Sequence, residues 1–514
     1  MNPNKYMLGV DIGTTSTKAV LYRETGEIIA QENNGYALHT PDVATAEQNP
    51  EEIFLAVRLS IKNIMHQSAI NPEDLAFISF SSAMHSVIAM DEFDQPVTRC
   101  ITWADNRSVH WAKKIKEDLN GHEIYLRTGT PTHPMSPLCK ITWIQHDKPE
   151  IAQQAKKYIG IKEYIFHQFF GEYVVDHSIA SATGMMNLKT LDWDGEALEV
   201  AGISADQLSR LVSTTEEFTG CRADLAKEMG ITTETRFVIG ASDGVLSNIG
   251  VNAIKKGEVA VTIGTSGAIR TVIPEPRTDV KGRIFCYALT EDHWVIGGPV
   301  NNGGMVLRWI RDEFAASEVE TAKRLGVDPY EVLTKIASRV EPGANGLLFH
   351  PFLAGERAPL WNANVRGSFI GLTLNHKKEH MVRAALEGVI FNLYTVFLAL
   401  VEVMDTPVTA IKATGGFAKS ELWRQMMADI FDQDVIVPES HESSCLGACL
   451  LGLYAQGKID SFNVVEDLIG STHEHKPDST HVEAYRELMA IFIRISRSLE
   501  DEYEQIAAYQ AKKK

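Results

Sequence analysis

Two short segments of the chain place glycine and hydroxyl side chains directly after an apolar run. Residues 6–10 lead into DIGTTSTK at 11–18, and residues 258–263 lead into GTSG at 264–267. Glycine-rich turns after strands bring backbone N–H groups close to an anion, and hydroxyl groups add further donors. The pair predicts two β-hairpins whose turns hold phosphate groups, although either turn alone would also suit an ordinary tight turn. The predicted phosphate contacts are Gly13, Thr14, Thr15, Ser16, Lys18, Gly264, Thr265 and Ser266.

A carboxylate and a third glycine turn extend this interpretation. Asp11 opens the first turn, and Mg²⁺ prefers carboxylate and water oxygens, so we expect Asp11 to contact a magnesium ion through water. Gly415 and Gly416 follow the apolar run 410–414 and form a third turn of this kind. Three such turns favour a nucleotide site over unrelated tight turns. The chain has no G-x-x-x-x-G-K-[ST] string, which excludes the P-loop class of nucleotide-binding proteins.

Asp243 is the candidate catalytic base. Transfer of a phosphoryl group to an alcohol needs in-line positioning, neutralised charge and an acceptor for the hydroxyl proton. Asp243 follows the apolar run 237–240 and lies between Ser242 and Gly244, where a side chain at a strand end can face a cleft. The alternative for an aspartate in this place is a helix N-cap, which its position alone does not exclude.

Four polar strings with aromatic or apolar neighbours would suit a sugar. They are SSAMH at 81–85, WADNR at 103–107, NNGG at 301–304 and ERAPLW at 356–361. A small-molecule site combines apolar and aromatic walls with a few well-placed polar groups, and a sugar needs many of the latter. Each string alone would also fit a loop with buried hydrogen bonds.

Strand-like and helix-like segments alternate along the chain, which predicts an α/β fold. The two hairpins lie about half the chain apart, and 514 residues exceed what one hydrophobic core holds. We therefore expect two similar domains, residues 1–247 and residues 248–514. The predicted strands cover 75–81, 237–240 and 410–414, and the predicted helices cover 50–66 after an Asn49 cap, 380–404, 443–457 and 480–512.

Composition disfavours several classes of protein. The net charge of −18 disfavours nucleic acid and anionic lipid as partners. The six cysteines include no C-x-x-C pair, and we expect Cys445 and Cys449 to be packed thiols. The N-terminus lacks the features of a signal peptide, and the apolar stretch 389–404 is interrupted by polar residues and looks too short to span a bilayer. We expect a cytoplasmic protein with small-molecule partners, as a monomer or a homodimer.

Two longer strings resemble the signatures of a known family. GSFIGL at 367–372, followed by HMVRAALE at 380–387, resembles the C-terminal signature of the FGGY carbohydrate kinases, and MSPLCKITW at 135–143 resembles the N-terminal one. The resemblance covers essentially the whole chain. It implies an α/β fold of two actin-like (ribonuclease H-like) domains around a central cleft, with ATP on the C-terminal side and the sugar on the N-terminal side.

The resemblance also implies roles for individual residues. Asp243 matches the general base of the family, and Asp11 matches the carboxylate near the metal and the sugar. Phe417 departs from the pattern, because many members carry a third glycine there, so the wall around the adenosine would differ. The further nucleotide contacts that it implies are Gly304, Arg308, Gly415, Gly416 and Ser420, and the substrate contacts are Met84, His85, Asp105, Arg107 and Asp243.

Within the family, the strings ITWADNR, TGTPTHPM and GGPVNNGG are most similar to members that phosphorylate D-gluconate to 6-phospho-D-gluconate. A partly desolvated carboxylate needs a cation or several N–H donors. The alternatives are a pentulose kinase such as xylulokinase, an actin-like or chaperone-like ATP-driven conformational protein, and an inactive sugar sensor. The presence of both Asp11 and Asp243 weighs against the last two. The candidate cations are His85, Arg107, His133, Lys162 and Arg357.

Overall fold

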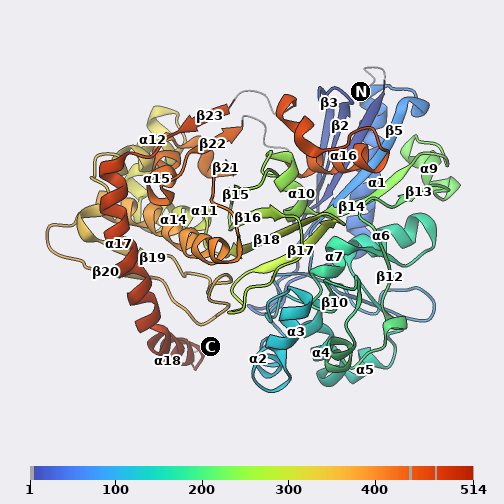
Figure 1. Cartoon of the computed structure of the whole chain (residues 1–514), viewed down its shortest axis with the longest axis horizontal. Coiled ribbons are helices and arrows are strands. Elements are labelled where there is room, and N and C mark those ends of the chain that lie inside the picture. Colours follow the sequence, from blue (N-terminus) through green and yellow to red (C-terminus); the bar gives the residue numbers. More distant parts are fainter. Residues whose placement is uncertain (1–4, 439–442, 469–471, 513–514) are drawn as a thin grey trace. The chain divides into compact units, whose positions relative to one another are not determined.

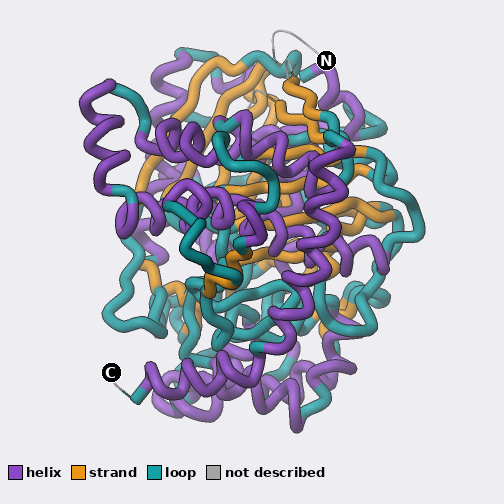
Figure 2. Tube along the Cα trace, turned by 90° about the vertical axis from the view of Figure 1, so that its left-hand side faces the viewer, coloured by secondary structure: helices purple, strands orange, loops and turns teal. Residues whose placement is uncertain are grey.

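The computed structural model describes residues 5–438, 443–468 and 472–512, in which strands and helices alternate as the sequence predicts (Figures 1 and 2). These residues form two compact units. The first comprises the described residues within Met1–Ile254, Val272–Ile296 and Glu442–Gly470, and the second those within Lys255–Thr271, Gly297–His441 and Ser471–Lys514. The border expected between residues 247 and 248 stays a prediction.

A six-stranded sheet runs through the first unit, in the order β13-β14-β5-β1-β2-β3. β1 and β2 pair antiparallel, with Asp11 opposite Lys18, and they form the first predicted hairpin. β1 also pairs parallel with β5, which brings Asp11 beside Ser81, and β5 pairs parallel with β14. The strands are β1 Tyr6–Ile12, β2 Ser16–Arg23, β3 Ile28–Gly35, β5 Leu75–Ser82, β13 Glu217–Phe218 and β14 Phe237–Ser242.

Both faces of this sheet are covered by apolar packing. Leu8 and Val10 of β1 join one buried cluster with residues of α1 (Pro50–Ser68), whose N-cap is the predicted Asn49. Met7 points the other way and joins a second cluster with α10 and α16. This alternation is the period of two expected of a strand between two layers. The other helices of the unit are α2 Val109–Asp118, α3 Gly121–Thr128, α4 Pro137–Asp147, α5 Pro149–Ala152, α6 Ile161–Phe170, α7 His177–Ser181, α8 Gly195–Ala201, α9 Ala223–Met229, α10 Asp243–Gly250 and α16 Ser443–Ala455.

Short strands complete the first unit. β4 pairs with β7, β6 with β8, β9 with β12 and β10 with β11. All six cysteines of the chain are free and buried, so the packed thiols expected at Cys445 and Cys449 are confirmed. The short strands are β4 Glu47–Gln48, β6 Ile88–Met90, β7 Cys100–Ile101, β8 Lys157–Ile159, β9 Val174–Asp176, β10 Met186–Asn187, β11 Asp192–Trp193 and β12 Arg210–Val212. β17 (Phe285–Thr290) also belongs to this unit, and β18 (His293–Val300) belongs to it up to Ile296.

The second unit repeats the strand pattern of the first. In it, five strands of a seven-stranded sheet follow one another in the order β16-β15-β21-β22-β23. β15 and β16 form the second predicted hairpin, β15 pairs parallel with β21, and β21 pairs parallel with β22. The order hairpin, parallel strand, parallel strand is that of β2-β1-β5-β14, so the predicted duplication is confirmed. The strands are β15 Glu258–Ile263, β16 Gly267–Ile273, β19 Leu348–His350, β20 Ser368–Ile370, β21 Ala410–Thr414, β22 Val435–Pro438 and β23 Thr472–His475.

Helix α14 (Lys378–Val403) is longer than the apolar stretch seen in the sequence. In the described part of the chain it is the one helix long and apolar enough to cross a membrane by length and composition, so the expectation that this region is too short was wrong. Within the second unit, 78% of its most apolar window is buried, as in the core helix of a globular protein.

The C-terminal helix predicted over 480–512 is two helices. α17 (Ser479–Ser498) ends at Leu499, whose N–H bonds to the carbonyls of Arg497 and Ile495, and α18 (Glu500–Ala511) follows directly. The other helices of the second unit are α11 Gly304–Phe314, α12 Ala316–Leu325, α13 Pro329–Ala337 and α15 Glu421–Phe431.

Candidate active site

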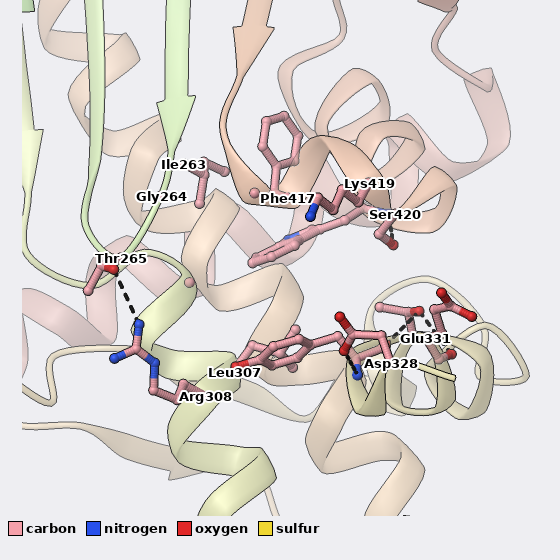
Figure 3. Close-up of a pocket in the computed structure, with 15 residues that line it drawn as sticks. Ile263, Gly264, Thr265, Leu307, Arg308, Asp328, Glu331, Phe417, Lys419 and Ser420 are labelled. Carbon is pink, nitrogen blue, oxygen red and sulfur yellow. Dashed lines mark hydrogen bonds between the residues drawn. The ribbon is translucent and has the colours of Figure 1, made fainter. Parts of the chain in front are cut away.

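A cavity of about 380 Å³ lies in the second unit, where the turn between β15 and β16 meets three helices (Figure 3). Six of the predicted nucleotide contacts line it: Gly264, Thr265, Gly304, Arg308, Gly416 and Ser420. The other lining residues are Ile263, Leu307, Asp328, Tyr330, Glu331, Thr334, Phe417, Lys419 and Trp423. Ser266 and Gly415, which were also predicted, are not among them.

The N-terminus of α11 packs directly on the β15–β16 turn. The N–H of Gly304 donates to the carbonyl of Gly264 at 2.7 Å, and the N–H of Met305 donates to that of Thr265 at 3.1 Å. A Cβ on Gly304 would lie 2.7 Å from the Gly264 oxygen, so the close approach requires glycine. Arg308, one turn along α11, donates from Nη2 to the Thr265 hydroxyl at 3.3 Å (Figure 3). The Thr265 hydroxyl and the Arg308 guanidinium thus meet at one end of the cavity, beside a turn that the helix N-terminus holds in place.

The opposite wall follows the third glycine turn. Gly415 has φ +105, and a Cβ there would overlap the carbonyl oxygen of Ile263, so Gly415 shapes the turn while Gly416 faces the cavity. Ser420 accepts a hydrogen bond from the N–H of Trp423 and caps α15. Phe417 is buried, and its ring meets that of Trp423 edge-on at 5.9 Å. The departure from the family pattern therefore adds an aromatic edge to this wall.

The sequence analysis missed the third wall, which α13 provides. Asp328 accepts from the N–H of Tyr330 and caps the helix, and Glu331 follows in its first turn (Figure 3). The string Asp328-Pro329 is a recognisable helix start, since aspartate caps and proline favours the first helical position. That signal predicts a helix but gives no indication that it lines a site.

In the first unit, the turn after Asp11 is held by polar contacts. The Ser81 hydroxyl donates to Asp11 Oδ1 at 2.6 Å, across the β1–β5 pairing. The Thr14 hydroxyl accepts from the Trp103 indole N–H at 2.9 Å, and its carbonyl accepts from Gln48 at 2.6 Å. The predicted phosphate turn is therefore fixed by side chains distant in sequence. Gly13 closes it, with its N–H donating to the carbonyl of Ser16 at 3.0 Å, and Thr15 and Lys18 lie on either side of Ser16.

His85 has an unusual backbone. Its φ is +69, a region that non-glycine residues rarely adopt, and its carbonyl accepts from Lys140 Nζ at 2.6 Å. Its Nδ1 lies 2.8 Å from the carbonyl oxygen of Ala182, and because a carbonyl only accepts, Nδ1 carries the proton. Lys140 also donates to Met135, and burial lowers its pKa to about 7. Met84, the other half of the predicted pair, lies half-buried beside His85.

Asp105 and Arg107 form a cluster with Glu47. Asp105 is fully buried and accepts from the N–H of Ala46 and from Arg107 Nε. Arg107 Nη2 contacts Glu47 at 2.5 Å, and its guanidinium lies over the Trp143 ring. Two carboxylates face one guanidinium, so this wall carries net negative charge. It suits sugar hydroxyl groups better than a second anion.

Asp243 is the first residue of α10, and Ser242 takes the N-cap position, so the alternative of Asp243 as the cap was wrong. Its Oδ1 accepts from the N–H of Gly244 at 2.6 Å. The positive end of a helix dipole favours the ionised carboxylate that a general base requires.

Sequence profiles now place this arrangement among known proteins. The N-terminal domain of the FGGY family of carbohydrate kinases matches residues 6–250, and the C-terminal domain of the same family matches residues 259–456. The chain belongs to the FGGY family of carbohydrate kinases. The predicted family and the predicted α/β, actin-like fold are both confirmed.

Relatives within the FGGY family differ in their sequence identity to this chain. The chain is 72% identical to the gluconokinase of Bacillus licheniformis over 505 residues and 71% identical to that of Bacillus subtilis over 506, with 98% of each chain covered. The xylulose kinase of Bacillus subtilis is 27% identical over 499 residues, covering 97% of this chain and 98% of its own. The crystal structure of gluconate kinase from Lactobacillus acidophilus has a TM-score of 0.92 at 38% identity, covering 98% of this chain and 99% of its own. A ligand-bound xylulose kinase from the same organism has the same score and identity, covering 98% and 100%.

The candidate cations for a sugar carboxylate differ in how far they are already engaged. Lys162 is buried and paired with Asp176 at 2.6 Å, which argues against it as a substrate contact. Arg107 is held by its two carboxylates, and Arg357, in the second unit, donates to Asn301 Oδ1 at 2.7 Å. His85 and His133 are the imidazoles among the candidates, and His133 Nδ1 accepts from the N–H of Met135.

A magnesium ion would find one protein carboxylate at the first turn. Among the described residues, no group of three or more His, Cys, Asp and Glu side chains could hold a metal ion. Mg²⁺ binds commonly through one or two carboxylates together with waters and substrate phosphates. Asp11, half-buried and bonded to Ser81, fits an ion that arrives with a nucleotide.

Proposed function

We propose that the protein transfers the γ-phosphoryl group of ATP to the terminal hydroxyl of D-gluconate, producing ADP and 6-phospho-D-gluconate. The observation that carries this proposal is the contrast between 71% identity to the gluconokinase and 27% identity to the xylulose kinase of the same Bacillus subtilis strain. Both relatives match the chain over nearly its full length, so the contrast concerns the substrate and not the fold.

Asp243 acts as the general base in this proposal. Its carboxylate, at the N-terminus of α10, accepts the proton of the terminal hydroxyl as that oxygen attacks the γ-phosphorus and the bond to the β-phosphate breaks. Its hydrogen bond from the N–H of Gly244 restrains the carboxylate at the start of α10. Positioning and charge neutralisation supply most of the remaining acceleration in such reactions.

ATP occupies the cavity of the second unit. The β15–β16 turn with Thr265 and Arg308 binds the phosphates, and the walls with Phe417 and Tyr330 enclose the adenosine. Mg²⁺, when bound, neutralises phosphate charge, and Asp11 is the protein carboxylate that would hold it through water. The contacts from Trp103 and Gln48 keep the first phosphate turn in one conformation before ATP binds.

The sugar acid lies against the polar wall of the first unit. His85 donates through Nδ1 to the carbonyl of Ala182, and in this proposal its Nε2 accepts a hydrogen bond from a sugar hydroxyl. The negatively charged cluster of Asp105, Arg107 and Glu47 binds hydroxyl groups at the far end of the substrate.

A coupled assay with several acceptors tests the proposal. We expect gluconate to exceed xylulose, ribulose and glycerol in kcat/KM by at least about 10²-fold, because a site built for an anion leaves its own donors unpaired with a neutral sugar. Equal or better turnover of xylulose would favour the pentulose kinase alternative. The 38% identity to the xylulose kinase structure is the observation that supports this alternative. ATP hydrolysis without any sugar dependence would indicate a conformational ATPase, and binding without turnover a sensor.

The proposed partners are small molecules, and the proposed location is the cytoplasm, where ATP is available. The net charge of −18 disfavours nucleic acid and anionic membranes. Light scattering at several concentrations separates a monomer from a homodimer.

A further inference from the structure

Strand β14 departs from regular pairing just before the proposed base. Val238 pairs with Ser79 of β5, and Ala241 pairs with Ser81, so β14 uses three residue steps where β5 uses two. An extra residue on one strand of a pair is a β-bulge, which leaves ladder groups unpaired and changes the strand direction. Bulges are over-represented next to active sites, where they re-aim a side chain.

The bulge is specified by glycine. Gly240 has φ +71, and a Cβ there would overlap the carbonyl oxygen of Phe80 on β5. No other residue combines that backbone with that close approach at low cost. The chain reaches Asp243 three residues later, so the geometry at Gly240 sets where α10 and its first carboxylate begin.

Lys162 of α6 holds the two carbonyl groups on either side of Gly240. Its Nζ donates to the carbonyl of Ile239 at 3.1 Å and to that of Ala241 at 3.2 Å. The third acceptor is Asp176 Oδ2 at 2.6 Å. An ammonium group has three donors, and here each has one acceptor. The side chain is 2% exposed, so these contacts form away from solvent.

Asp176 links this lysine to a second support. Apart from the ion pair, its Oδ2 has no hydrogen-bond partner in the described residues, while Oδ1 accepts from the N–H of Ile179 and caps α7. On α7, the Ser178 hydroxyl accepts from the N–H of Ser242 and contacts the Ser242 hydroxyl, both at 3.1 Å. The residue before Asp243 is thus held by the helix that Asp176 caps.

We propose that Lys162 and Asp176 are positioning residues that clamp the β14 bulge and thereby fix Asp243 in the orientation that takes the substrate proton. This inference rests on the proposed function, because it requires Asp243 to be the base. Burial lowers the pKa of Lys162, and the carboxylates of Asp176, Glu163 and Asp243 oppose that change, so Asp243 lies within electrostatic reach of the clamp. A misplacement of about 1 Å costs a catalytic group on the order of 10²-fold in rate.

A double-mutant cycle tests the clamp. We expect Lys162→Met to lower kcat of the folded enzyme about 10–100-fold with the KM for ATP unchanged. In the Asp243→Asn background the same change should cause no further loss, because the clamp acts only through that carboxylate. The inference would be overturned if Lys162→Met kept the wild-type kcat. It would also be overturned if Lys162→Met lowered kcat by the same factor in the Asp243→Asn background as in the wild type.

Lys458→Met is the matched control. It removes a lysine from the buried carboxylate of Glu24 in the same unit, at 2.5 Å, away from β14. It should lower the melting temperature and leave kcat unchanged, which separates loss of a partly buried ion pair from loss of the clamp.

If Lys162→Met does not fold, Ser178→Ala tests the clamp instead. Losing its two hydrogen bonds to Ser242, each contributing about 1 kcal/mol, should lower kcat about 5–30-fold, again with the KM for ATP unchanged. Unchanged turnover in Ser178→Ala would then overturn the clamp. An active Asp243→Asn enzyme would instead overturn the base assignment, so the two failures are distinguishable.

Discussion

The proposed nucleotide cavity of the second unit and the proposed polar site of the first are built from different materials. Glycines, backbone groups and helix N-termini shape the cavity around Gly264, Gly304 and Gly416. The polar site consists of buried or half-buried side chains that are already hydrogen-bonded within the unit. Its members are Lys162 with Asp176, Arg107 with Asp105 and Glu47, and His85 with Lys140. A backbone-built cavity recognises phosphate in any nucleotide, whereas a side-chain network can be specific to one sugar.

This difference predicts where substitutions act. In the cavity, changing one side chain removes one contact and leaves the glycine turns in place. In the polar site, removing one partner leaves another buried group unpaired, which costs more than the lost contact itself. The largest effects are therefore expected in the first unit.

Replacing the proposed base should have the largest effect on catalysis. Asp243→Asn keeps the shape of the side chain but cannot accept the proton, so kcat should fall by about 10²–10⁴-fold. ATP affinity should be unchanged, because the cavity lies in the second unit. Steady-state kinetics and calorimetry measure the two quantities. Turnover at the wild-type rate would remove Asp243 from its role.

Changing the cavity should have a smaller and more specific effect. Thr265→Val removes the hydroxyl that accepts from Arg308 and faces the proposed phosphates. A hydrogen bond to a charged group contributes about 1.5–3 kcal/mol, so ATP affinity should fall about 10–100-fold while gluconate affinity is unchanged. Thr334→Val, also in the cavity but on α13, is the control and should weaken ATP less. A loss confined to the sugar would show that the turn has been misplaced.

The sequence predicted the elements whose signals are local. Both hairpins, the strand before Gly415 and the Asn49 cap follow from neighbouring residues, and the structure confirms them. Six predicted nucleotide contacts also line one cavity, although their roles stay predictions. The break at Leu499 was missed because the helical pattern continues across it.

Contacts between distant segments could not be predicted from the sequence. Nothing near Asp328 indicates that its helix faces the turn at Thr265, because that proximity depends on tertiary packing. Lys162 was a candidate cation for the substrate, and only the coordinates show its pairing with Asp176. Lys140 belongs to the string that resembles the N-terminal family signature. Its hydrogen bond to the carbonyl of His85 joins residues 55 positions apart, so the string did not predict it.

The smallest expected effect concerns stability and pH. Lys140 is buried with a pKa lowered to about 7 by that burial, whereas the unfolded chain has an ordinary lysine near 10.5. Between these values the folded lysine is neutral and the unfolded one is protonated, so unfolding takes up a proton and a rise in pH stabilises the fold. Relative to Lys140→Met, the wild type should gain stability from pH 7 toward pH 10, with a slope of at most about 1.4 kcal/mol per pH unit. Urea unfolding at several pH values measures the difference, and Lys189→Met, at an exposed lysine, is the control. A pH-independent difference for Lys140→Met would show that the lysine keeps its proton in the folded protein, and the polar site would then hold one more positive charge near the proposed sugar carboxylate.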